Sequence, residues 1–468
     1  MAAKPAPPSP YPYYTEPFDL KDRPARFLKA FAAILQNTNY GPVLDAFARI
    51  SLHCGRCAET CQVHQATNAT PDNPCNRSNL LLKVYRRYFT MSGMLKARLG
   101  FGWNLSDADI DEMAEAYYRC TACRRCRTVC PVGIDHGLVT HIARWVLAEI
   151  GIVPKALVLA VREQLEGKSG NTSGIPAPAL KDTLEFLEQE FVDNYGVKVP
   201  FPVDADGAEH VFFPAVSDYL LEPDVLMGVA GVMHASGGSW TIGTGYFDGI
   251  NYGLFYSDRM LSRIVRKELA EVKRLHGKKI LIGECGHASR VAREFGPIFG
   301  GGPTEAPPVV NIMEYTYDAF RRGALKLKKG VIPERTTYHD PCNIVRSGWI
   351  VEQPREILKH ICADFVEMTP NRKDNYCCGG GSGTVSIDEM RAFRTGTQGL
   401  RKAKQIRETG ATLVVSPCAN CKKQIREVCE DNGLKNVRVV GLHDLVLKAI
   451  EFPESSRVKK EGPAPAGA

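Results

Sequence analysis

NYCCGGG, residues 375–381, places two adjacent cysteines directly before three glycines. Three further cysteines complete a pattern around this stretch, at Cys342, Cys418 and Cys421. Thiolates are the soft ligands that select iron–sulfur clusters, zinc or copper(I). An adjacent pair cannot easily place both sulfurs on one tetrahedral ion, but it can span neighbouring irons of a cluster. The five cysteines therefore predict a metal centre, and the adjacent pair favours an iron–sulfur cluster over zinc.

The residues around this pattern alternate between short apolar strands and helical segments from about residue 209 onward. Residues 279–284 and 412–417 both read as strands that follow a helical segment. Such alternation predicts a mostly parallel sheet covered by helices, with ligands gathering at the carboxyl ends of the strands. Cys285 and Cys418 each follow directly on one of these strands, so both are expected at such an end.

This α/β region reads as two copies of one plan, in which an apolar strand precedes a turn. Ala215 stands in the first copy where the second has Cys342, and no Cys-Cys pair precedes Cys285. We therefore expect a degenerate first repeat over residues 206–330 and a complete cysteine-rich repeat over residues 331–452. On this interpretation the chain completes one such metal centre rather than two.

Residues 120–131 hold the cysteine spacing of bacterial ferredoxins, C-x2-C-x2-C-x3-C-P. In that run the first three cysteines ligate one cubane [4Fe–4S] cluster and the fourth crosses to a second cluster. A partner motif upstream lacks its first cysteine, because Ser51 takes that place, and Cys75 is the candidate for the missing ligand. The alternative for Cys75 is a buried structural cysteine. We predict one cubane on Cys54, Cys57, Cys75 and Cys130, and the other on Cys61, Cys120, Cys123 and Cys126.

Composition is that of an ordinary globular protein with several domains. The chain has 468 residues, 44% of them hydrophobic and 24% charged, with a net charge of +7. We find neither the apolar core of a secretory signal nor an apolar stretch of the roughly 18 residues that a spanning helix needs. Sixteen cysteines without an export signal argue against a disulfide framework and for metal or redox chemistry in the cytoplasm. No basic run with interleaved aromatics occurs, so nucleic acid is not an expected partner.

The rest of the chain divides by composition. Residues 1–50 are expected to form a Pro-rich extension and then amphipathic helices, which either pack on the neighbouring domain or dock onto a membrane-embedded partner. Residues 51–165 are expected to form a helical ferredoxin-like domain with two clusters. Residues 166–205 read as a linker and residues 453–468 as a flexible tail. The expected fold class is a multidomain α+β or α/β protein, with the helical two-cluster domain followed by a duplicated α/β domain.

Three segments carry a family resemblance: His339-Asp340-Pro341-Cys342, the stretch 375–381, and Ser416-Pro417-Cys418-Ala419-Asn420-Cys421. Together they resemble the cysteine-rich CCG domain of heterodisulfide reductase catalytic subunits. In that family five cysteines hold a noncubane [4Fe–4S] cluster at which the disulfide is cleaved. The resemblance implies that the corresponding ligands here are Cys342, Cys377, Cys378, Cys418 and Cys421.

The fusion of a paired-cubane domain to one CCG-type unit also resembles the catalytic cytoplasmic subunit of the Dsr-type membrane complexes of sulfur-metabolising prokaryotes. Related multihaem redox complexes contain similar subunits. The resemblance implies a hetero-oligomeric complex on the inner face of the cytoplasmic membrane, with a cytochrome b or quinone-reactive partner embedded in it. It also implies a small cysteine-bearing protein or a small-molecule disulfide as substrate.

We therefore expect reductive cleavage of a disulfide or trisulfide, or the reverse oxidation of thiols, with the two cubanes relaying electrons. The alternative is an electron-transfer subunit of a glycolate- or lactate-oxidising complex, which takes electrons from a flavoprotein and has no substrate site of its own. The sequence offers no site for a flavin or a nicotinamide. It fixes neither the sulfur substrate nor the direction of electron flow.

Four features near these cysteines leave two interpretations open. Cys285, a candidate catalytic residue, either faces the surviving centre from the first repeat or is structural. The segment 240–253 either lines the substrate entrance or is an interdomain loop. The glycines over 379–383 lack the spacing of a phosphate loop and are expected to let the backbone pass close to the cluster. Asp135 and His136 could tune a cluster through hydrogen bonds, but a solvated turn is the favoured interpretation.

Overall fold

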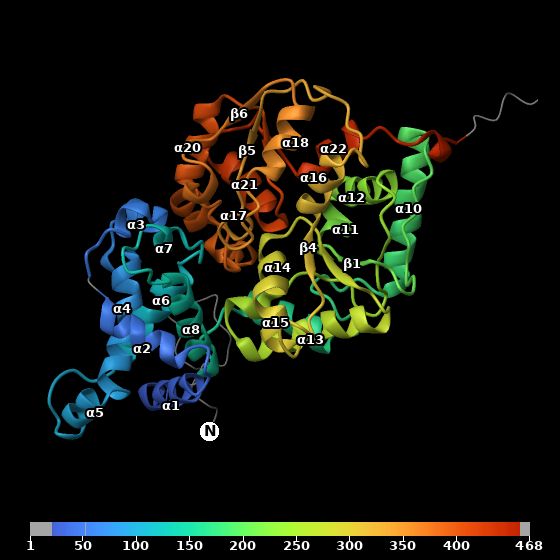
Figure 1. Ribbon diagram of the computed structural model, residues 1–468. Coiled ribbons are helices and arrows are strands. Elements are labelled where there is room, and N and C mark those ends of the chain that lie inside the picture. Colours follow the sequence, from blue (N-terminus) through green and yellow to red (C-terminus); the bar gives the residue numbers. More distant parts are fainter. Residues whose placement is uncertain (1–20, 52, 459–468) are drawn as a thin grey trace, which may run out of the picture.

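In the computed structural model, which describes residues 21–51 and 53–458, a helical domain lies beside two α/β halves (Figure 1). The extension expected over residues 1–20 and the last part of the expected tail, residues 459–468, lie outside the described residues. The helical domain contains α1 (Arg23–Leu35), α2 (Gly41–Ile50), α3 (Gln62–Thr67), α4 (Pro74–Tyr88), α5 (Met91–Arg98), α6 (Asp107–Tyr118), α7 (Arg125–Thr128) and α8 (His136–Glu149).

The helices before the cysteines follow from their apolar periodicity. In α1 the buried side chains of Phe27, Phe31 and Ile34 recur at helical spacing. Gly41 and Pro42 begin α2, because proline is well tolerated in the first turn of a helix. The apolar faces of α1 and α2 pack with those of α4, α6 and α8 into one core.

The first α/β half forms a parallel four-stranded sheet in the order β2-β1-β3-β4. Its elements are β1 (His210–Phe213), α11 (Asp218–Leu221), α12 (Pro223–Ala235), β2 (Trp240–Thr241), α13 (Asp258–Arg274), β3 (Lys279–Ile282), α14 (Gly286–Arg290), α15 (Gly296–Phe299), β4 (Val309–Asn311) and α16 (Ile312–Arg321). The central strands are apolar and almost entirely buried, as expected where helices cover both faces of a sheet.

The second half forms a parallel sheet in the corresponding order, β6-β5-β7-β8. Its elements are β5 (Thr336–Tyr338), α17 (Cys342–Ser347), α18 (Gln353–Ile361), β6 (Phe365–Glu367), α19 (Arg391–Phe393), α20 (Leu400–Thr409), β7 (Leu413–Val415), α21 (Ala419–Asp431), β8 (Arg438–Val440) and α22 (Leu442–Ala449). The predicted parallel sheets covered by helices are therefore confirmed.

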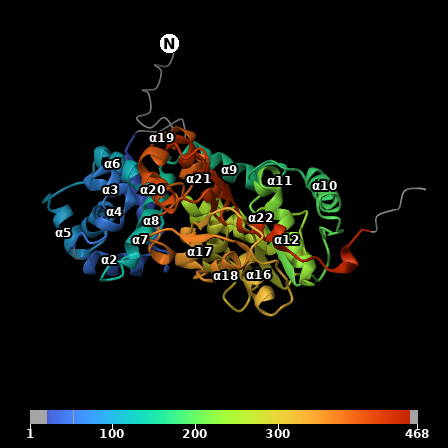
Figure 2. The ribbon, with the colours of Figure 1, turned by 90° about the horizontal axis from the view of Figure 1, so that it is seen from above.

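Two helices connect the helical domain to the first half. They are α9 (Lys155–Glu166) and α10 (Ala177–Tyr195), and α10 falls within the range 166–205 that the sequence indicated as a linker. Leucines of α10 recur at helical spacing and pack into the core of the first half, so this segment is an integral helix. In both views α10 lies at the end of the molecule opposite α5 (Figures 1 and 2). Among the helices of the described part of the chain, none combines the length and the apolar character needed to span a bilayer.

Candidate metal centres

The first cysteine-lined cavity lies at the outer side of the helical domain, and we call it the outer cavity. Cys75 reaches it from the first turn of α4, where the Asn73 side chain accepts a hydrogen bond from the Cys75 N–H at 3.1 Å. The Cys130 Sγ accepts a hydrogen bond from the Ile134 N–H at 3.3 Å. Its cysteines are Cys54, Cys57, Cys75 and Cys130, with Ser51, His53 and His136 also in the lining.

A second cavity lies deeper, and we call it the inner cavity. Its cysteines are Cys61, Cys120, Cys123 and Cys126. Ala122 and Arg124 take left-handed backbone conformations, with φ of 48° and 61°, which bend the chain around the cavity. The buried Arg77 guanidinium also lines it and would offset thiolate charge. The two cavities divide the eight cysteines as the spacing predicted, and ligation of a metal by them stays a prediction.

The third site holds the five cysteines of the second half, and we call it the five-cysteine site. All five side chains are buried. Cys342 begins α17 shortly after β5, and Cys418 caps α21 after β7, so both lie beyond the carboxyl ends of central strands. Hydrogen bonds from the thiols of Cys123 and Cys342 lower the pKa of the Cys377 thiol. Those from Cys377 and Cys421 hold the pKa of Cys378 well below its usual value. Thiols this close together would lose their protons when they bind a shared metal centre.

His339 is a member of this site that the sequence analysis quoted but gave no role. One of its ring nitrogens and the Sγ atoms of Cys378 and Cys421 all lie within 4.8 Å of one another. The ring is fully buried, and its Nε2 has no hydrogen-bond partner among the described residues. Burial holds the pKa of His339 well below its usual value, so the ring is neutral. Five buried thiols beside one free imidazole nitrogen fit an iron–sulfur centre.

The inner cavity and the five-cysteine site lie against each other. Cys123, from the inner cavity, packs with the five cysteines, and its thiol hydrogen-bonds to Cys377. The Gln62 side chain donates to the Cys377 carbonyl oxygen at 3.2 Å across 315 positions of sequence. Arg346, in α17, donates to the Cys123 carbonyl oxygen at 2.8 Å and also to the Asn375 carbonyl oxygen. Side-chain-to-backbone hydrogen bonds thereby hold the two cysteine-bearing loops together.

Comparisons with known proteins agree with this geometry. Residues 52–134 match the family described as a 4Fe-4S dicluster domain, and residues 336–426 match the cysteine-rich CCG domain. An Hdr-like menaquinol oxidoreductase iron-sulfur subunit 2 of Archaeoglobus fulgidus is 26% identical over 82% of this chain and 76% of its own length. One subunit of the dihydromethanophenazine:CoB–CoM heterodisulfide reductase of Methanosarcina barkeri is 27% identical over 88% of this chain and 95% of its own length.

The chain is similar to iron–sulfur subunits of heterodisulfide reductase-like enzymes. It contains a 4Fe-4S dicluster domain and a CCG domain. The relatives support an oxidoreductase role for it. A more distant relative, one subunit of the fumarate reductase (CoM/CoB) of Methanothermobacter marburgensis, is 27% identical over 71% of this chain and 61% of its own length.

The glycine run of the CCG domain approaches the dicluster domain. A Cβ on Gly381 would lie 2.6 Å from the Thr121 carbonyl oxygen, next to Cys120. Gly379 has φ of 102°, which only glycine adopts readily, and its N–H donates to the Cys377 Sγ at 3.5 Å. The glycines thus allow the close contact between the two domains as well as a tight turn at the cysteine pair.

Cys285, in the first half, faces the CCG domain. It is fully buried at the N-terminus of α14, and α14 packs on α17. Burial and the nearby Cys418 thiol hold the pKa of Cys285 well above its usual value. Its Sγ lies 3.5 Å from the His287 Nδ1, and the Asn420 side chain contacts the same nitrogen at 3.4 Å. The structure therefore brings Cys285 to the Cys418 side of the five-cysteine site.

An open cleft of about 610 Å³ reaches the same place from the surface. We call it the entrance cleft, and its lining includes Ala419 and Asn420, which lie between Cys418 and Cys421. Tyr252, from the segment 240–253, lines the cleft, accepts a hydrogen bond from the Ser386 hydroxyl at 3.0 Å, and stacks on His287. Part of the 240–253 segment therefore does line a cleft beside the cysteines.

Asp135 and His136 do not lie in a solvated turn, and that interpretation of the sequence was wrong. Both side chains are buried. The Asp135 carboxylate caps α8 by accepting hydrogen bonds from the Gly137 and Leu138 N–H groups. His136 lines the outer cavity, its Nδ1 lies 2.8 Å from the Ser78 hydroxyl, and its Nε2 has no partner among the described residues. Burial lowers the pKa of His136 to about 4, so a neutral ring faces the cavity.

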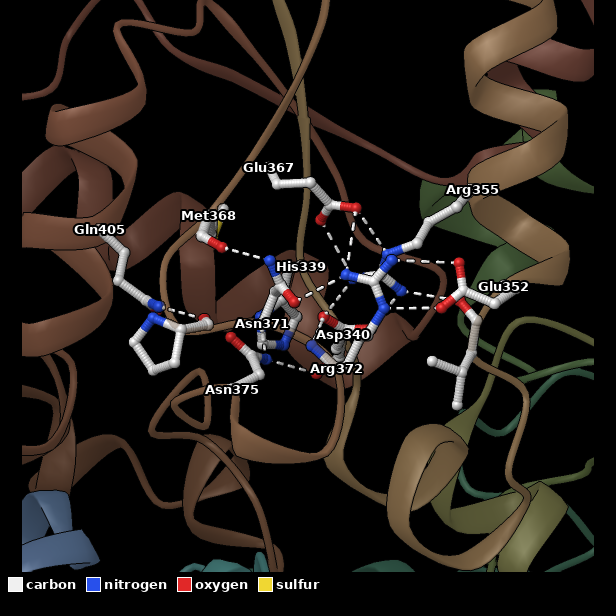
Figure 3. A network of polar contacts seen from close by, with 12 residues as sticks. His339, Asp340, Glu352, Arg355, Glu367, Met368, Asn371, Arg372, Asn375 and Gln405 are labelled. Carbon is white, nitrogen blue, oxygen red and sulfur yellow. Dashed lines mark hydrogen bonds and ion pairs between the residues drawn. The ribbon is translucent and has the colours of Figure 1, made fainter.

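A buried charge network fixes the loop that precedes Cys342 (Figure 3). The Arg355 guanidinium donates to both oxygens of Asp340, at 2.8 and 2.7 Å, and to Glu367 at 2.7 Å. Asp340 also accepts the Arg372 N–H at 2.7 Å. Arg355 and Asp340 are both buried. Each charge offsets the cost of burying the other, so removal of either one would destabilise the fold. The network holds the His339–Cys342 loop without supplying a ligand.

Proposed function

We propose that this chain is the iron–sulfur subunit of a membrane-associated redox complex, and that it exchanges electrons with a disulfide or trisulfide at the five-cysteine site. One observation carries the proposal: the outer cavity, the inner cavity and the five-cysteine site follow one another, with Cys123 packed against the five cysteines. A relay of this kind joins a partner at the helical domain to a substrate at the CCG domain. The named relatives, which are subunits of redox enzymes, support the same role.

The proposed cofactors are two cubane [4Fe–4S] clusters in the outer and inner cavities and one noncubane [4Fe–4S] cluster at the five-cysteine site. The noncubane cluster would supply single electrons and an iron accessible to sulfur. The chain supplies the thiolates, keeps the site dry and holds a neutral imidazole, His339, beside two of the thiolates. Backbone N–H groups of Gly379 and Gly380 donate to the Sγ atoms of Cys377 and Cys378 and would stabilise their negative charge.

Cys75→Ser is expected to damage the outer cubane alone. Serine is a poor replacement for a thiolate, so the protein should lose one cluster's share of iron and of the cubane EPR signal. Cys429→Ser is the matched control, because Cys429 is buried but lies in neither cavity. Unchanged iron content and spectra in the Cys75 variant would mean that Ser51 or a water completes the site instead.

The two α/β halves support the proposal of a duplicated CCG architecture. Their sheets share one strand order, and α12 packs on α22 as the corresponding pair, α18 and α16, pack on each other. The first copy keeps Cys285 at the end of its strand but has Ala215 where Cys342 stands in the second. The duplication therefore supports one complete noncubane centre, with Cys285 contributed by the degenerate copy.

We assign Cys285 a catalytic role beside the noncubane centre. Its thiol, the His287 ring and the Asn420 side chain lie next to Cys418, beside the lining of the entrance cleft. A neutral thiol there can donate a proton to the substrate sulfur that leaves as a thiolate. Since burial keeps the Cys285 thiol protonated, it would act as a proton donor rather than as an attacking thiolate.

Filling the entrance cleft is expected to impair substrate binding. Ala160, in α9, lines the cleft, whereas the preceding residue, Leu159, does not and is largely exposed. Ala160→Trp should raise the KM for a disulfide about ten-fold with little change in kcat, because the added ring occupies the route to Ala419. Leu159→Trp should leave both constants unchanged. Equal kinetics of the two variants, at equal iron content, would show that substrate enters elsewhere.

The experiment that tests the function is anaerobic purification followed by a viologen assay. Reduced viologen supplies electrons, and its oxidation on addition of a disulfide or trisulfide measures turnover. Turnover by the protein with its full iron content supports the proposal. Full iron content without turnover, together with rapid reduction by a flavoprotein, would instead favour the electron-transfer subunit that has no substrate of its own.

A further inference from the structure

Helix α5 presents its large apolar side chains to solvent. Met91, Met94, Leu95 and Leu99 lie on one face at helical spacing, and Phe101 follows directly after the helix. Their exposed fractions are 86% for Met91, 48% for Met94, 60% for Leu95, 60% for Leu99 and 66% for Phe101. Scattered exposed apolar residues are ordinary, but a contiguous set this large marks an interaction surface. We call it the α5 face.

The opposite side of α5 explains this orientation. Gly93 is buried against the carbonyl oxygen of Arg86, at the end of α4, so closely that a Cβ would clash with it. Because Gly93 lets the helix backbone lie on α4, the small residues face the protein and the large apolar residues face outward. The apolar side of an ordinary surface helix faces the core, so α5 has the reverse arrangement.

Cations surround the α5 face. Arg98 lies on it, and Lys96 lies beside it; both are exposed. A groove of about 1110 Å³ between α2, α4 and α5 adds further cations, and among the described residues that line it Asp45 is the one carboxylate. The cations of that groove are Arg49, Lys83, Arg86, Arg87 and Lys96, of which Arg49 pairs with Asp45 and Arg87 is buried. Apolar side chains ringed by lysine and arginine are the pattern of helices that lie in the headgroup region of an anionic bilayer.

We infer that the α5 face binds an anionic lipid surface directly. In both views α5 lies at the extreme end of the molecule, so the other elements of residues 21–51 and 53–458 do not obstruct its approach to a bilayer (Figures 1 and 2). A partner polypeptide would need a concave surface to cover the same residues, whereas a lipid interface accepts a projecting one. The cationic groove beside the face can meet anionic headgroups at the same time.

This contact would place the outer cavity near the membrane. Helix α2 borders the groove and leads to Ser51, His53 and Cys54, which line the outer cavity. Electrons from a membrane donor would then enter the relay at the end that faces the bilayer. The inference rests on the proposed function only for its location at a membrane and does not depend on the disulfide chemistry.

The test is sedimentation of the purified, iron-loaded protein with vesicles of phosphatidylcholine, with and without phosphatidylglycerol. We expect binding to the anionic vesicles that weakens with salt. Met91→Gln/Leu95→Gln/Leu99→Gln should weaken it about ten-fold or more, since it removes most of the inserted apolar surface. Lys96→Glu/Arg98→Glu should have a similar effect and should abolish the preference for phosphatidylglycerol.

Phe186→Gln is the matched control, because Phe186 lies on α10 at the opposite end and is 61% exposed. It should bind vesicles as the wild type does, whereas Phe101→Gln should bind less. Absence of wild-type binding, or binding that survives the triple substitution, would overturn the inference. A third outcome would also overturn it: the wild type does not bind vesicles, and the α5 variants no longer co-purify with a membrane subunit. That result would assign the face to a protein partner. Viologen-driven disulfide reduction should be unaffected in the α5 variants, so failure of the proposed function would be seen separately.

Discussion

Cys377→Ala is expected to abolish disulfide reduction and the noncubane EPR signal while both cubane signals remain. The thiol of Cys377 hydrogen-bonds with Cys342 and with Cys123, so it occupies the junction between the five-cysteine site and the inner cavity. Removing it would delete one proposed ligand of the adjacent pair and the thiol that hydrogen-bonds to Cys123 of the inner cavity. Iron content, EPR of the reduced protein and the viologen assay together measure the loss.

The control for this substitution is Cys362→Ala. Cys362 is buried at the end of α18 but packs in a separate apolar core, so its loss should leave every cluster signal in place. If Cys377→Ala retained the noncubane spectrum, the assignment of the five ligands would be refuted. If it lost a cubane signal as well, Cys377 would have to stabilise the inner site through Cys123.

Arg355→Ala is expected to destabilise the protein by about 3–5 kcal/mol, because it leaves the carboxylate of Asp340 buried and unpaired. Glu367 would lose its closer partner too, but it is partly exposed and keeps the longer ion pair with Arg372, at 3.7 Å. The loop from His339 to Cys342 should become mobile, so that iron is lost from the noncubane site first. Chemical denaturation followed by fluorescence, with iron release measured in parallel, tests both effects.

Arg438→Ala is the matched control, because Arg438 pairs with Glu334 at 2.6 Å on the exposed surface. Exposed pairs contribute about 0–1 kcal/mol, so this variant should differ little from the wild type. A similar loss of stability in the two variants would contradict the account of a buried network. Replacing both Asp340 and Arg355 by neutral residues should cost less than Arg355→Ala alone, since no fully buried charge is then left unpaired.

Local sequence patterns predicted the elements well. The strand that ends before Cys418 and the one that ends before Cys285 follow from apolar runs bounded by helical segments, and β7 and β3 lie there. The start of α2 at Gly41 and Pro42 also follows from backbone chemistry alone. These features depend on residues a few positions apart, so the chain needs no distant partner to express them.

The predictions that failed are those about which side chains are buried and which way they face. Asp135 and His136 are polar and follow a proline, so a solvated turn was the natural interpretation, yet α8 packs them inside the helical domain. His339 was quoted for its motif alone, because nothing in the spacing says that its ring turns toward Cys378. A histidine next to the Asp-Pro-Cys sequence is the one signal that could have suggested it. The reversed orientation of α5 also depends on how Gly93 meets α4.

By itself the sequence determined which cysteines are the candidates for the chemistry. Cysteine spacing acts over a few residues, so it predicts a wrap around a cluster without knowledge of the fold. Only the tertiary structure brought Cys75 to the cavity of Cys54, Cys57 and Cys130, and packed Cys123 against the five cysteines. Contacts such as that of Gln62 with Cys377 cross 315 positions, and they form only when the helical domain packs against the second α/β half. The order of the three sites is therefore a property of domain packing, which local spacing does not encode.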